Sequence, residues 1–421
     1  MKKCILTTLL ALILVQVGTT QSKVITLDQV RAKALEIYPA NKQKALYRAA
    51  LAISNDLLHS NLLPQLSVTG QATYQSEVTK FDLPGSPIEI PQPTPDQERI
   101  GVEAKYNLTD FGALHTQQHI QEQTAQTQML QADISLQRLK EQLDGLYTNV
   151  LLVQQNKQIL QARIADIDAR MRNVESAVRN GVSLRSNLLV LQSEEQSTLQ
   201  RIDELNSQLL TLTESLQILT GQPIDTSYQF QLPVTENIDS SKINRPESQL
   251  YAAQRQLSAL QGDLLRQQNH PHVYLFAQGD YGRPGYNFLN NSFRVYGIAG
   301  IGLNWNINNV LNQPQNLQML SIRQQQVTEE ENLFNQQLSL TLTQERNEEI
   351  RYKTLIQRDS AIVVAREAIA HAAASQLENG AITSTEYLTE LNALNTAHLN
   401  ETLHRVQLAM AKEHLKTTLG L

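Results

Sequence analysis

The sequence contains an internal duplication, and this repeat constrains the fold more than any other feature of the chain. Residues of the first half recur 207 positions later, and beyond the next loop the spacing falls to 199. Each unit is roughly 180–200 residues long, far longer than a solenoid repeat, and there are only two. The pattern predicts two copies of one elaborate building block. The recurring residues are Pro39, Leu57, Leu58, Pro64 and Tyr74, matched by Pro246, Leu264, Leu265, Pro271 and Tyr281, and then Asn107, Gly181, Leu189, Leu209, Leu216 and Gly221, matched by Asn306, Gly380, Leu388, Leu408, Leu415 and Gly420.

The N-terminal residues have the plan of a secretory signal peptide. Lys2 and Lys3 form a positive n-region, an apolar run covers 5–15, and small residues follow from Gly18. We therefore expect residues 1–20 to be removed on export. The single cysteine, Cys4, precedes the apolar run, so the exported chain would contain no disulfide.

Composition and charge narrow the classes of function. Aromatic residues make up 5% of the chain, the formal net charge is −6, and Lys and Arg do not cluster, so no nucleic-acid partner is expected. No segment after the signal reaches 18 consecutive apolar residues, so we expect no transmembrane helix. Strands that span a membrane give a much weaker signal per segment, and the composition leaves them open.

Each copy is expected to begin with helices that give way to a pair of strands. In the first copy (21–221), Thr26-x-x-Gln29 is a capping-box pattern, and Pro64 ends the helical segment. In the second copy (245–421), Pro271 ends the matching segment. Beyond these prolines, apolar and polar residues alternate, which fits either a half-buried antiparallel sheet or a membrane barrel. The predicted strands are 65–75, 99–108, 272–281 and 294–307.

Aromatic residues stand near the ends of these predicted strands. Tyr74 and Tyr281 end the outgoing strands, whereas Tyr106 and Trp305 come late on the returning ones. A strand of about ten residues tilted near 45° spans roughly 25 Å, the height of the apolar band of an outer-membrane barrel. If the strands cross a bilayer, we expect these four residues to form aromatic girdles at its two interfaces.

Long helices follow each strand pair. Apolar residues recur every seven positions from 136 to 178 with a break at Lys157, which predicts a left-handed supercoiled helix over 113–178. Asn180-Gly181 ends it, because Gly readily adopts the left-handed conformation of a helix C-cap, and a returning helix follows over 184–220. The second copy repeats this order with a helix over 312–378, Asn379-Gly380 and a helix over 383–419. An irregular linker, 222–244, separates the copies.

The helix lengths predict how each copy packs. The helix before the strands, about 23 residues, and the returning helix, about 36, together nearly equal the long helix of about 65. Two short helices stacked end to end can lie antiparallel along the long one, which would place a strand hairpin at one end of a helical rod and a tip turn at the other. Four strands are too few to close a barrel, whereas three chains would supply twelve.

These features together resemble the TolC-like outer-membrane efflux factors over essentially the whole mature chain. The resemblance rests on the proline before each first strand, Tyr106-Asn-Leu-Thr-Asp-Phe-Gly112, the two Asn-Gly tips, Leu219-Thr-Gly221 and Arg245-Pro-Glu. It implies a homotrimer with a 12-stranded transmembrane β-barrel on a long periplasmic α-barrel, in the outer membrane of a Gram-negative bacterium. It also implies that the tips, Asn180, Gly181, Asn379 and Gly380, dock a periplasmic adaptor (membrane fusion protein) that serves an inner-membrane pump.

The resemblance also implies a periplasmic gate of acidic residues, which this chain reproduces only in part. Counting from Gly380, the two gate positions are Glu386 and Thr389, and counting from Gly181 they are Asn187 and Val190. A tyrosine–arginine latch of the family is replaced here by Leu377 and Ile382. Three Glu386 carboxylates around a narrow axis would repel one another and raise their pKa, and would attract cations. The competing interpretation is an ordinary solvated Glu on a helix surface.

No pattern in the sequence predicts catalysis, a cofactor or a metal. His270-Pro-His272 has no Cys, Asp or Glu beside it, and we expect a strand-entry turn there. The glycine-containing stretches lack the following Lys-Ser/Thr of a phosphate loop. No nucleophile–base arrangement is found, so an enzyme is not expected.

The sequence therefore favours a passive outer-membrane exit duct of a tripartite efflux or type I secretion system. The alternative is a soluble periplasmic coiled-coil adaptor or scaffold. Contact with lipid separates the two, because a duct requires an uncharged outward stripe on its strands. The predicted stripe is Val68, Ala72, Val102, Ala104, Leu275, Leu303 and Trp305.

Overall fold

In the part of the chain that the structure describes, the protein forms helices, one four-stranded sheet and one short parallel pair of strands. The computed structural model describes residues 23–79, 85, 92–234 and 242–421. The predicted signal peptide, 1–20, lies outside the described residues. The elements, in chain order, are β1 (Val24–Ile25), α1 (Leu27–Ile37), α2 (Pro39–Ser60), β2 (Gln65–Tyr74), β3 (Asp96–Asn107), α3 (Ala113–Arg179), α4 (Arg185–Thr220), β4 (Gln229–Phe230), α5 (Pro246–Gln268), β5 (His272–Arg283), β6 (Arg294–Asn304), α6 (Ile307–Glu378) and α7 (Ser384–Leu419).

The largest difference from the predicted bounds lies where the last strand passes into a helix. β6 ends at Asn304 rather than at 307, and α6 begins at Ile307 rather than at 312. The side-chain oxygen of Asn306 accepts a hydrogen bond from the backbone N–H of Asn309 at 3.3 Å. Asn in this position caps a helix by satisfying one of its free N–H groups, so the helix starts earlier than the heptad pattern alone indicates.

The chain divides into two compact units, each built from both sequence repeats. The strand unit comprises Tyr38–Leu139, Asp239–Gln344 and Lys416–Leu421. The tip unit comprises Met1–Ile37, Lys140–Ile238 and Glu345–Leu415. The long helices α3 and α6 each begin in the strand unit and end in the tip unit, so the repeats are duplicated in sequence but not separate as compact bodies.

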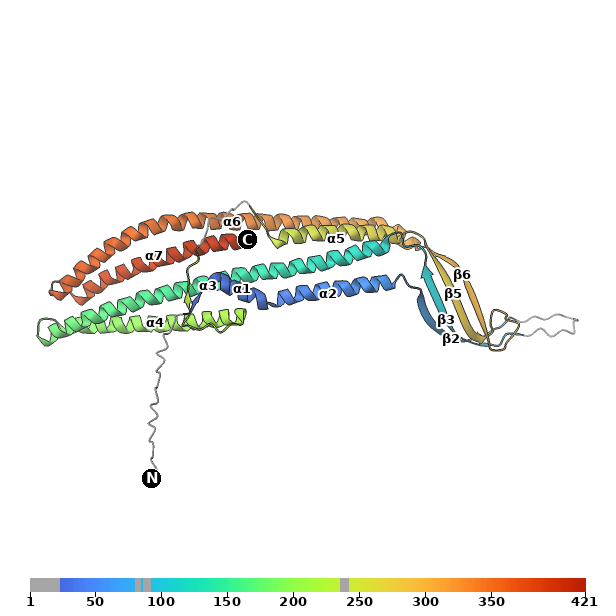
Figure 1. Cartoon of the computed structure of the whole chain (residues 1–421), viewed down its shortest axis with the longest axis horizontal. Helices are drawn as coiled ribbons and strands as arrows, with labels where there is room; N and C mark the ends of the chain where they lie inside the picture. The colour runs from blue at the N-terminus through green and yellow to red at the C-terminus, as the bar shows by residue number, and fades with distance from the viewer. Residues whose placement is uncertain (1–22, 80–84, 86–91, 235–241) are drawn as a thin grey trace, which may run out of the picture. The chain divides into compact units, whose positions relative to one another are not determined.

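In the strand unit, four strands lie side by side in one layer in the order β2-β3-β5-β6, with every neighbouring pair antiparallel (Figure 1). The register places Val68 opposite Val102, and Val102 opposite Gly279. Residues directly opposite one another share a face of a sheet. Alternate residues along each strand therefore belong to alternate faces of the sheet, and the register shows which residues of neighbouring strands share a face.

The Tyr106–Gly112 segment contains the last two residues of β3 and the turn that joins it to α3. The carboxylate of Asp110 accepts the backbone N–H of Leu114 at 3.1 Å, and so caps the helix. Phe111 and Gly112 both have positive φ, 49° and 81°. The hydroxyl of Thr109 accepts the backbone N–H of Val273 at 2.8 Å, which ties the turn to the start of β5. The motif thus has a structural role at the junction of strand and helix.

In the tip unit, one apolar cluster is built from four helices of both repeats. It includes Ile167 and Val174 of α3, Leu191 of α4, Leu377 of α6 and Leu391 of α7. Each fully buried aliphatic side chain contributes about 1.5–3 kcal/mol relative to an exposed one. The heptad seam of α3 therefore packs against the second repeat as well as against its own returning helix.

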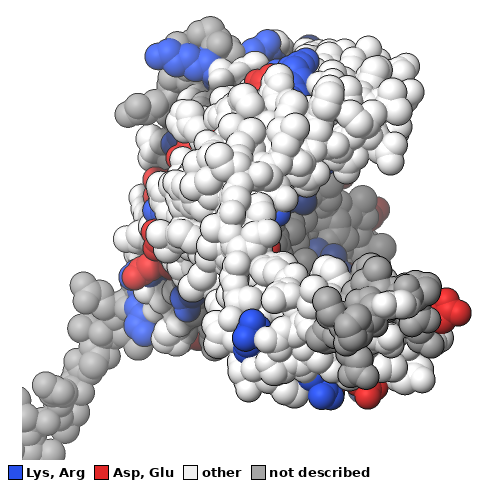
Figure 2. Space-filling view, turned by 90° about the vertical axis from the view of Figure 1, so that its right-hand side faces the viewer, with Lys and Arg blue, Asp and Glu red and all other residues white. Residues whose placement is uncertain are grey.

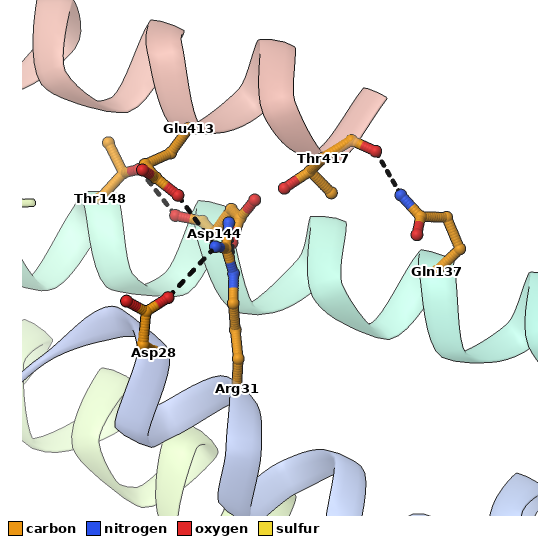
Figure 3. A network of polar contacts seen from close by, with 7 residues as sticks. All are labelled: Asp28, Arg31, Gln137, Asp144, Thr148, Glu413 and Thr417. Atoms are coloured by element: carbon orange, nitrogen blue, oxygen red, sulfur yellow. Dashed lines mark hydrogen bonds and ion pairs between the residues drawn. The ribbon is translucent and has the colours of Figure 1, made fainter. Parts of the chain in front are cut away.

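A buried ion network also lies in the tip unit and joins α1, α3 and α7 (Figure 3). The guanidinium of Arg31 lies 2.6 Å from the carboxylate of Asp144 and 2.9 Å from that of Glu413, and Asp28 lies 3.8 Å away at the exposed side. The side chain of Asp144 is 0% exposed and that of Glu413 9%. Buried charges of this kind are tolerated only when they are paired, so the three elements depend on Arg31.

Tyr147 of α3 lies in the same region and contacts the backbone of β1 and the residue after β4. Its hydroxyl lies 3.0 Å from the carbonyl oxygen of Ile25 and 2.6 Å from that of Gln231. These carbonyls flank the short parallel pair of β1 and β4. Burial raises the pKa of the Tyr147 hydroxyl, so it remains a hydrogen-bond donor at any physiological pH.

Candidate functional site

The two tip turns have nearly the same backbone geometry. Gly181 and Gly380 both have φ of +71°. After each long helix, a backbone N–H returns to the last turn: Val182 donates to the carbonyl of Ala177 at 2.9 Å, and Ala381 to that of Gln376 at 2.8 Å. These bonds satisfy carbonyls that the helix leaves free at its C-terminus.

The glycines are required by conformation and not by crowding. A Cβ atom added to Gly181 or Gly380 would meet nothing within 4 Å, whereas φ near +71° is strained for any L side chain. Asn180 and Asn379 are exposed beside them. The tips are thus tightly defined turns with free space around them, which is suitable for docking a partner.

Glu386 lies at the start of α7, where it forms a capping box with Thr383. Its carboxylate accepts the backbone N–H of Thr383 at 2.7 Å and the Thr383 hydroxyl at 3.0 Å. In return, the backbone N–H of Glu386 donates to the Thr383 hydroxyl oxygen at 3.2 Å. The arrangement satisfies two free donors of the helix N-terminus reciprocally.

This contact changes the expected electrostatics of Glu386. The backbone N–H and hydroxyl of Thr383 lower the pKa of the carboxyl below its usual value. The sequence analysis expected a raised pKa, but that expectation depends on three carboxylates meeting around an axis. Within one chain, the cap favours the charged form.

The first repeat has no equivalent cap. The N-cap of α4 is Leu184, which has no side-chain hydrogen bond to the helix. At the position matching Glu386, the side chain of Asn187 lies 3.2 Å from the Ser183 hydroxyl. Val190 packs partly buried against the apolar cluster, whereas Thr389 of the second repeat is exposed. The carboxylate therefore distinguishes the second tip from the first.

The polar links between the repeats near the tip come from residues that the sequence analysis did not single out. Leu377 and Ile382, at the places of the family latch, belong to the apolar cluster. Instead, the hydroxyl of Tyr387 on α7 donates to Asp166 on α3, and Arg170 on α3 pairs with Glu378 on α6. These contacts connect α3 of the first repeat to the long helix α6 and the returning helix α7 of the second.

The hydrogen bond from Tyr387 to Asp166 is made by a buried tyrosine. Tyr387 is 1% exposed, and its pKa is raised by burial and by the neighbouring Asp166. Arg170 also lies 3.6 Å from the carboxylate of Asp166. A cavity of about 400 Å³ adjoins this cluster and is lined by Arg163, Arg170, Asp166 and Tyr387 among others. A local signal in the sequence, the oppositely charged i,i+4 pair Asp166 and Arg170 beside the apolar seam, could have indicated the cluster.

The sheet presents one face made of apolar and small residues. Its exposed members include Val68, with 73% of its surface accessible, and Val102, with 51%. On this face the central parts of all four strands carry no charge; Asp96, Glu98 and Arg283 lie only toward the loop ends. The residues of this apolar face are Leu66, Val68, Gly70, Ala72, Tyr74, Ile100, Val102, Ala104, Tyr106, Leu275, Ala277, Gly279, Tyr281, Val295, Gly297, Ala299, Ile301 and Leu303.

The opposite face of the sheet is polar in the first repeat and aromatic over glycine in the second. β2 contributes Ser67, Thr69 and Gln71 to it. On the same face in the second repeat, a Cβ atom added to Gly302 of β6 would lie 2.3 Å from the ring of Tyr274 on β5. Lys105 stands over the same ring, with Nζ 3.9 Å from its centroid. The sheet is therefore amphipathic across its thickness.

The predicted girdle residues stand at the two ends of the apolar face. Tyr74 is the last residue of β2, and Tyr281 lies near the end of β5, both next to the connecting loops. Tyr106 lies at the helical end of β3. Trp305 follows β6 by one residue, and its ring N–H donates to the carbonyl of Asn269 at 2.9 Å.

Other kinds of site are not found in the part of the chain that the structure describes. No helix there is both long enough and apolar enough to cross a membrane. Over the same residues, no group of three or more His, Cys, Asp or Glu side chains is placed to hold a metal ion. The face in Figure 2 shows scattered basic and acidic groups on a largely uncharged surface and no extended basic patch.

Residues 30–222 match the family model described as outer membrane efflux protein. This family consists of efflux proteins and not of enzymes. None of the curated protein sequences matches the chain.

Solved structures of outer-membrane channels share the fold over nearly the whole chain. The outer membrane protein VceC from Vibrio cholerae is 14% identical, with a TM-score of 0.71 over 94% of this chain and 96% of that one. The CmeC channel of Campylobacter jejuni is 12% identical, with a TM-score of 0.70 over 94% and 85%. The MtrE channel of Neisseria gonorrhoeae, in its open state, is 16% identical, with a TM-score of 0.69 over 94% and 88%. The chain thus shares the fold of these outer-membrane proteins, and its residues 30–222 match the outer membrane efflux protein family.

Proposed function

We propose that this chain, which carries an outer membrane efflux protein domain at residues 30–222 and has the fold of outer-membrane channels, is a passive exit duct for an efflux or type I secretion system. The duct would lie in the outer membrane and extend into the periplasm. It would pass small molecules or proteins from an inner-membrane pump and a periplasmic adaptor to the exterior. The chain would supply the pore, the gate and the docking tip, and the partner pump would supply the energy.

The amphipathic sheet is the observation that carries this proposal. Its apolar face is exposed across all four strands, with charges only toward the loop ends. In a soluble protein such a face would need a covering layer, whereas in a membrane barrel it faces lipid. The polar side chains of Ser67, Thr69 and Gln71 would then line the lumen.

Three chains would complete the barrel. Within one chain β2 and β6 are the edges of the sheet, each with a row of unpaired backbone groups on one side. Lipid offers no hydrogen bonds, so such edges must pair. Pairing β2 of one chain with β6 of the next, three times, uses 12 strands and leaves no edge.

The tips would provide the docking surface for the adaptor. Asn180, Gly181, Asn379 and Gly380 are exposed turns with defined backbone geometry. A groove of about 500 Å³ in the tip unit is lined by residues beside both turns, including Val182 and Ala381. A helical hairpin from an adaptor could place apolar side chains there.

Cell fractionation and gel electrophoresis test the proposal. We expect the mature chain in the outer-membrane fraction, extracted only by detergent, and running as a trimer when the sample is not heated. Outer-membrane barrels keep every strand paired, which explains resistance to detergent at room temperature. A monomer recovered from the periplasmic fraction would refute the duct.

Glu386 is the proposed gate residue, and a matched pair of substitutions separates charge from capping. Glu386→Gln keeps the capping box, because Gln also serves at this position, but removes the carboxylate. We expect it to lower the preference for cations over anions in planar-bilayer recordings. Thr383→Val keeps the carboxylate and removes the cap, which costs about 0.5–2 kcal/mol of helix stability.

The lowered pKa of Glu386 sets the pH range of this test. A carboxyl whose folded pKa is depressed stabilises the fold above its unfolded pKa, and this contribution is lost as the pH falls through the folded value. At neutral pH, therefore, both Thr383→Val and the unaltered channel carry the charge. Equal ion preference in Glu386→Gln and the unaltered channel would remove Glu386 as a gate.

A further inference from the structure

Two histidines on the first turns of α3 point their ring nitrogens at one another. His115 and His119 are four residues apart, which places both on the same side of the helix. Their Nε2 atoms lie 3.2 Å apart, and their ring centroids 4.3 Å. Both side chains are exposed in the chain. The pair lies close to the turn that joins β3 to the helix.

The spacing of these nitrogens agrees with that of two ligands on one metal ion. Imidazole nitrogens bind zinc at about 2.0–2.1 Å, so two of them are about 2.9 Å apart at a right angle and about 3.3 Å apart at the tetrahedral angle. The observed 3.2 Å falls between these values. Little rearrangement of either ring would be needed to admit an ion.

A neighbouring carboxylate orients one of the two rings for coordination. Nδ1 of His119 lies 3.0 Å from the carboxylate of Glu122. When Nδ1–H donates to this carboxylate, the lone pair of Nε2 is directed toward His115. A carboxylate on the far nitrogen of a metal-binding histidine fixes the ring and raises its basicity.

The other histidines of the strand unit are engaged differently. The ring of His270 packs on Phe111, with centroids 4.9 Å apart, and His272 contacts the carbonyl oxygens of Thr109 and Gln268. Nε2 of His59 lies 3.1 Å from the amide nitrogen of Gln118. The convergent geometry is thus specific to His115 and His119.

We propose that His115 and His119 form a binding site for a divalent transition-metal ion, with Glu122 as the outer carboxylate. Imidazole suits Cu²⁺, Ni²⁺ and Zn²⁺, and of these Cu²⁺ binds nitrogen sites most tightly. No third protein ligand is grouped with the pair among the described residues, so water completes the coordination. Such a site is open and exchanges its ion readily. Coordination joins two successive turns of α3 where the strand passes into the helix.

Calorimetric titration of the purified mature protein in detergent with Cu²⁺, Ni²⁺ or Zn²⁺ tests the site. We expect one ion per chain, with the tightest binding for Cu²⁺. Either His115→Ala or His119→Ala should abolish it, and Glu122→Ala should weaken it about 10–100-fold. Alanine is the best helix former, so these variants keep α3 intact. His371→Ala, at an exposed histidine on α6, is the matched control and should bind as the unaltered chain does.

The outcomes distinguish this site from unspecific binding. Retained stoichiometry in His115→Ala and in His119→Ala would overturn the proposal, as would no binding of any of the three ions. Binding lost equally in His371→Ala would also overturn it. Circular dichroism and the unheated gel confirm that each variant is folded. The result does not depend on channel activity, so it can fail while the duct proposal stands.

Discussion

Replacing Arg31 by Met is expected to destabilise the protein by about 3–5 kcal/mol, the cost of breaking a buried ion pair by removing one partner. Met fills the volume of the Arg stem, so packing changes little. The loss arises because the carboxylates of Asp144 and Glu413 would remain buried without the guanidinium that lies 2.6 Å and 2.9 Å from them. Denaturant unfolding of the purified protein, followed by circular dichroism, measures the change.

Lys33 offers a matched control on the same helix. Its ammonium lies 3.0 Å from the carboxylate of Glu36, but the side chains are 47% and 66% exposed. Exposed pairs contribute about 0–1 kcal/mol, so Lys33→Met should leave the free energy of unfolding nearly unchanged. Equal effects of Arg31→Met and Lys33→Met would contradict the interpretation.

A triple substitution separates the cost of an unpaired charge from the value of the network. Arg31→Met combined with Asp144→Leu and Glu413→Leu removes all three buried charges. Replacing a whole buried network by apolar residues is often neutral or stabilising. We therefore expect the triple variant to recover most of the stability lost in Arg31→Met. A further loss would mean that the network contributes to stability beyond charge balance.

The regular parts of the fold were predictable because their signal is local. The heptad spacing of α3 and the two-residue alternation of β2 are visible within a short window of sequence. The capping box at Thr26 and Gln29 was also readable, and both of its hydrogen bonds are present, at 3.1 and 3.3 Å. These features depend on neighbours along the chain, so one sequence suffices to find them.

The same motif was overlooked at the second tip. Thr383-x-x-Glu386 has the capping-box pattern, yet the sequence analysis considered Glu386 only as a gate or an ordinary surface residue. The family resemblance identifies Glu386 by its distance from Gly380, whereas the capping box depends on its distance from Thr383. The contacts between Glu386 and Thr383 are those of a helix cap. The proposed gate role of Glu386 therefore has to be tested against this capping role.

Contacts between distant parts of the chain could not be predicted. Arg31 reaches Asp144 across 113 positions and Glu413 across 382, and Tyr387 reaches Asp166 across 221. Nothing in the periodicity shows which polar residues on three different helices will meet. Only packing of the apolar seams determines it, because the seams set the rotation of each helix.

The proposed metal-binding histidines, His115 and His119, were not predicted from the sequence for another reason. His115 and His119 have a simple helical spacing, whereas His270-Pro-His272 is the place where two histidines are closest in sequence. On a strand, residues two apart share a face, and on a helix residues four apart do. Reading histidine spacing together with the expected element would have favoured the pair on α3.

The second large effect is predicted for the apolar face of the sheet, which we propose contacts lipid. Val68→Arg is expected to reduce assembly strongly, because Arg near the bilayer midplane of a barrel costs about 2–4 kcal/mol on the lipid face. Val68 is the better choice over Leu66 or Tyr74, since it lies in the middle of β2 and the cost falls to about 0–1 kcal/mol near the interfaces. The amount of trimer in the outer membrane, measured on unheated gels, reports the effect.

Thr69→Arg is the control, because it alters the next residue on the opposite face of the same strand. If that face lines a water-filled lumen, the arginine remains solvated and assembly should be nearly unchanged. Both positions are exposed in the isolated chain, so a soluble adaptor would tolerate both substitutions within about 0.5 kcal/mol. Equal tolerance would therefore overturn the duct, whereas a loss confined to Val68→Arg requires lipid on the apolar face and water on the other.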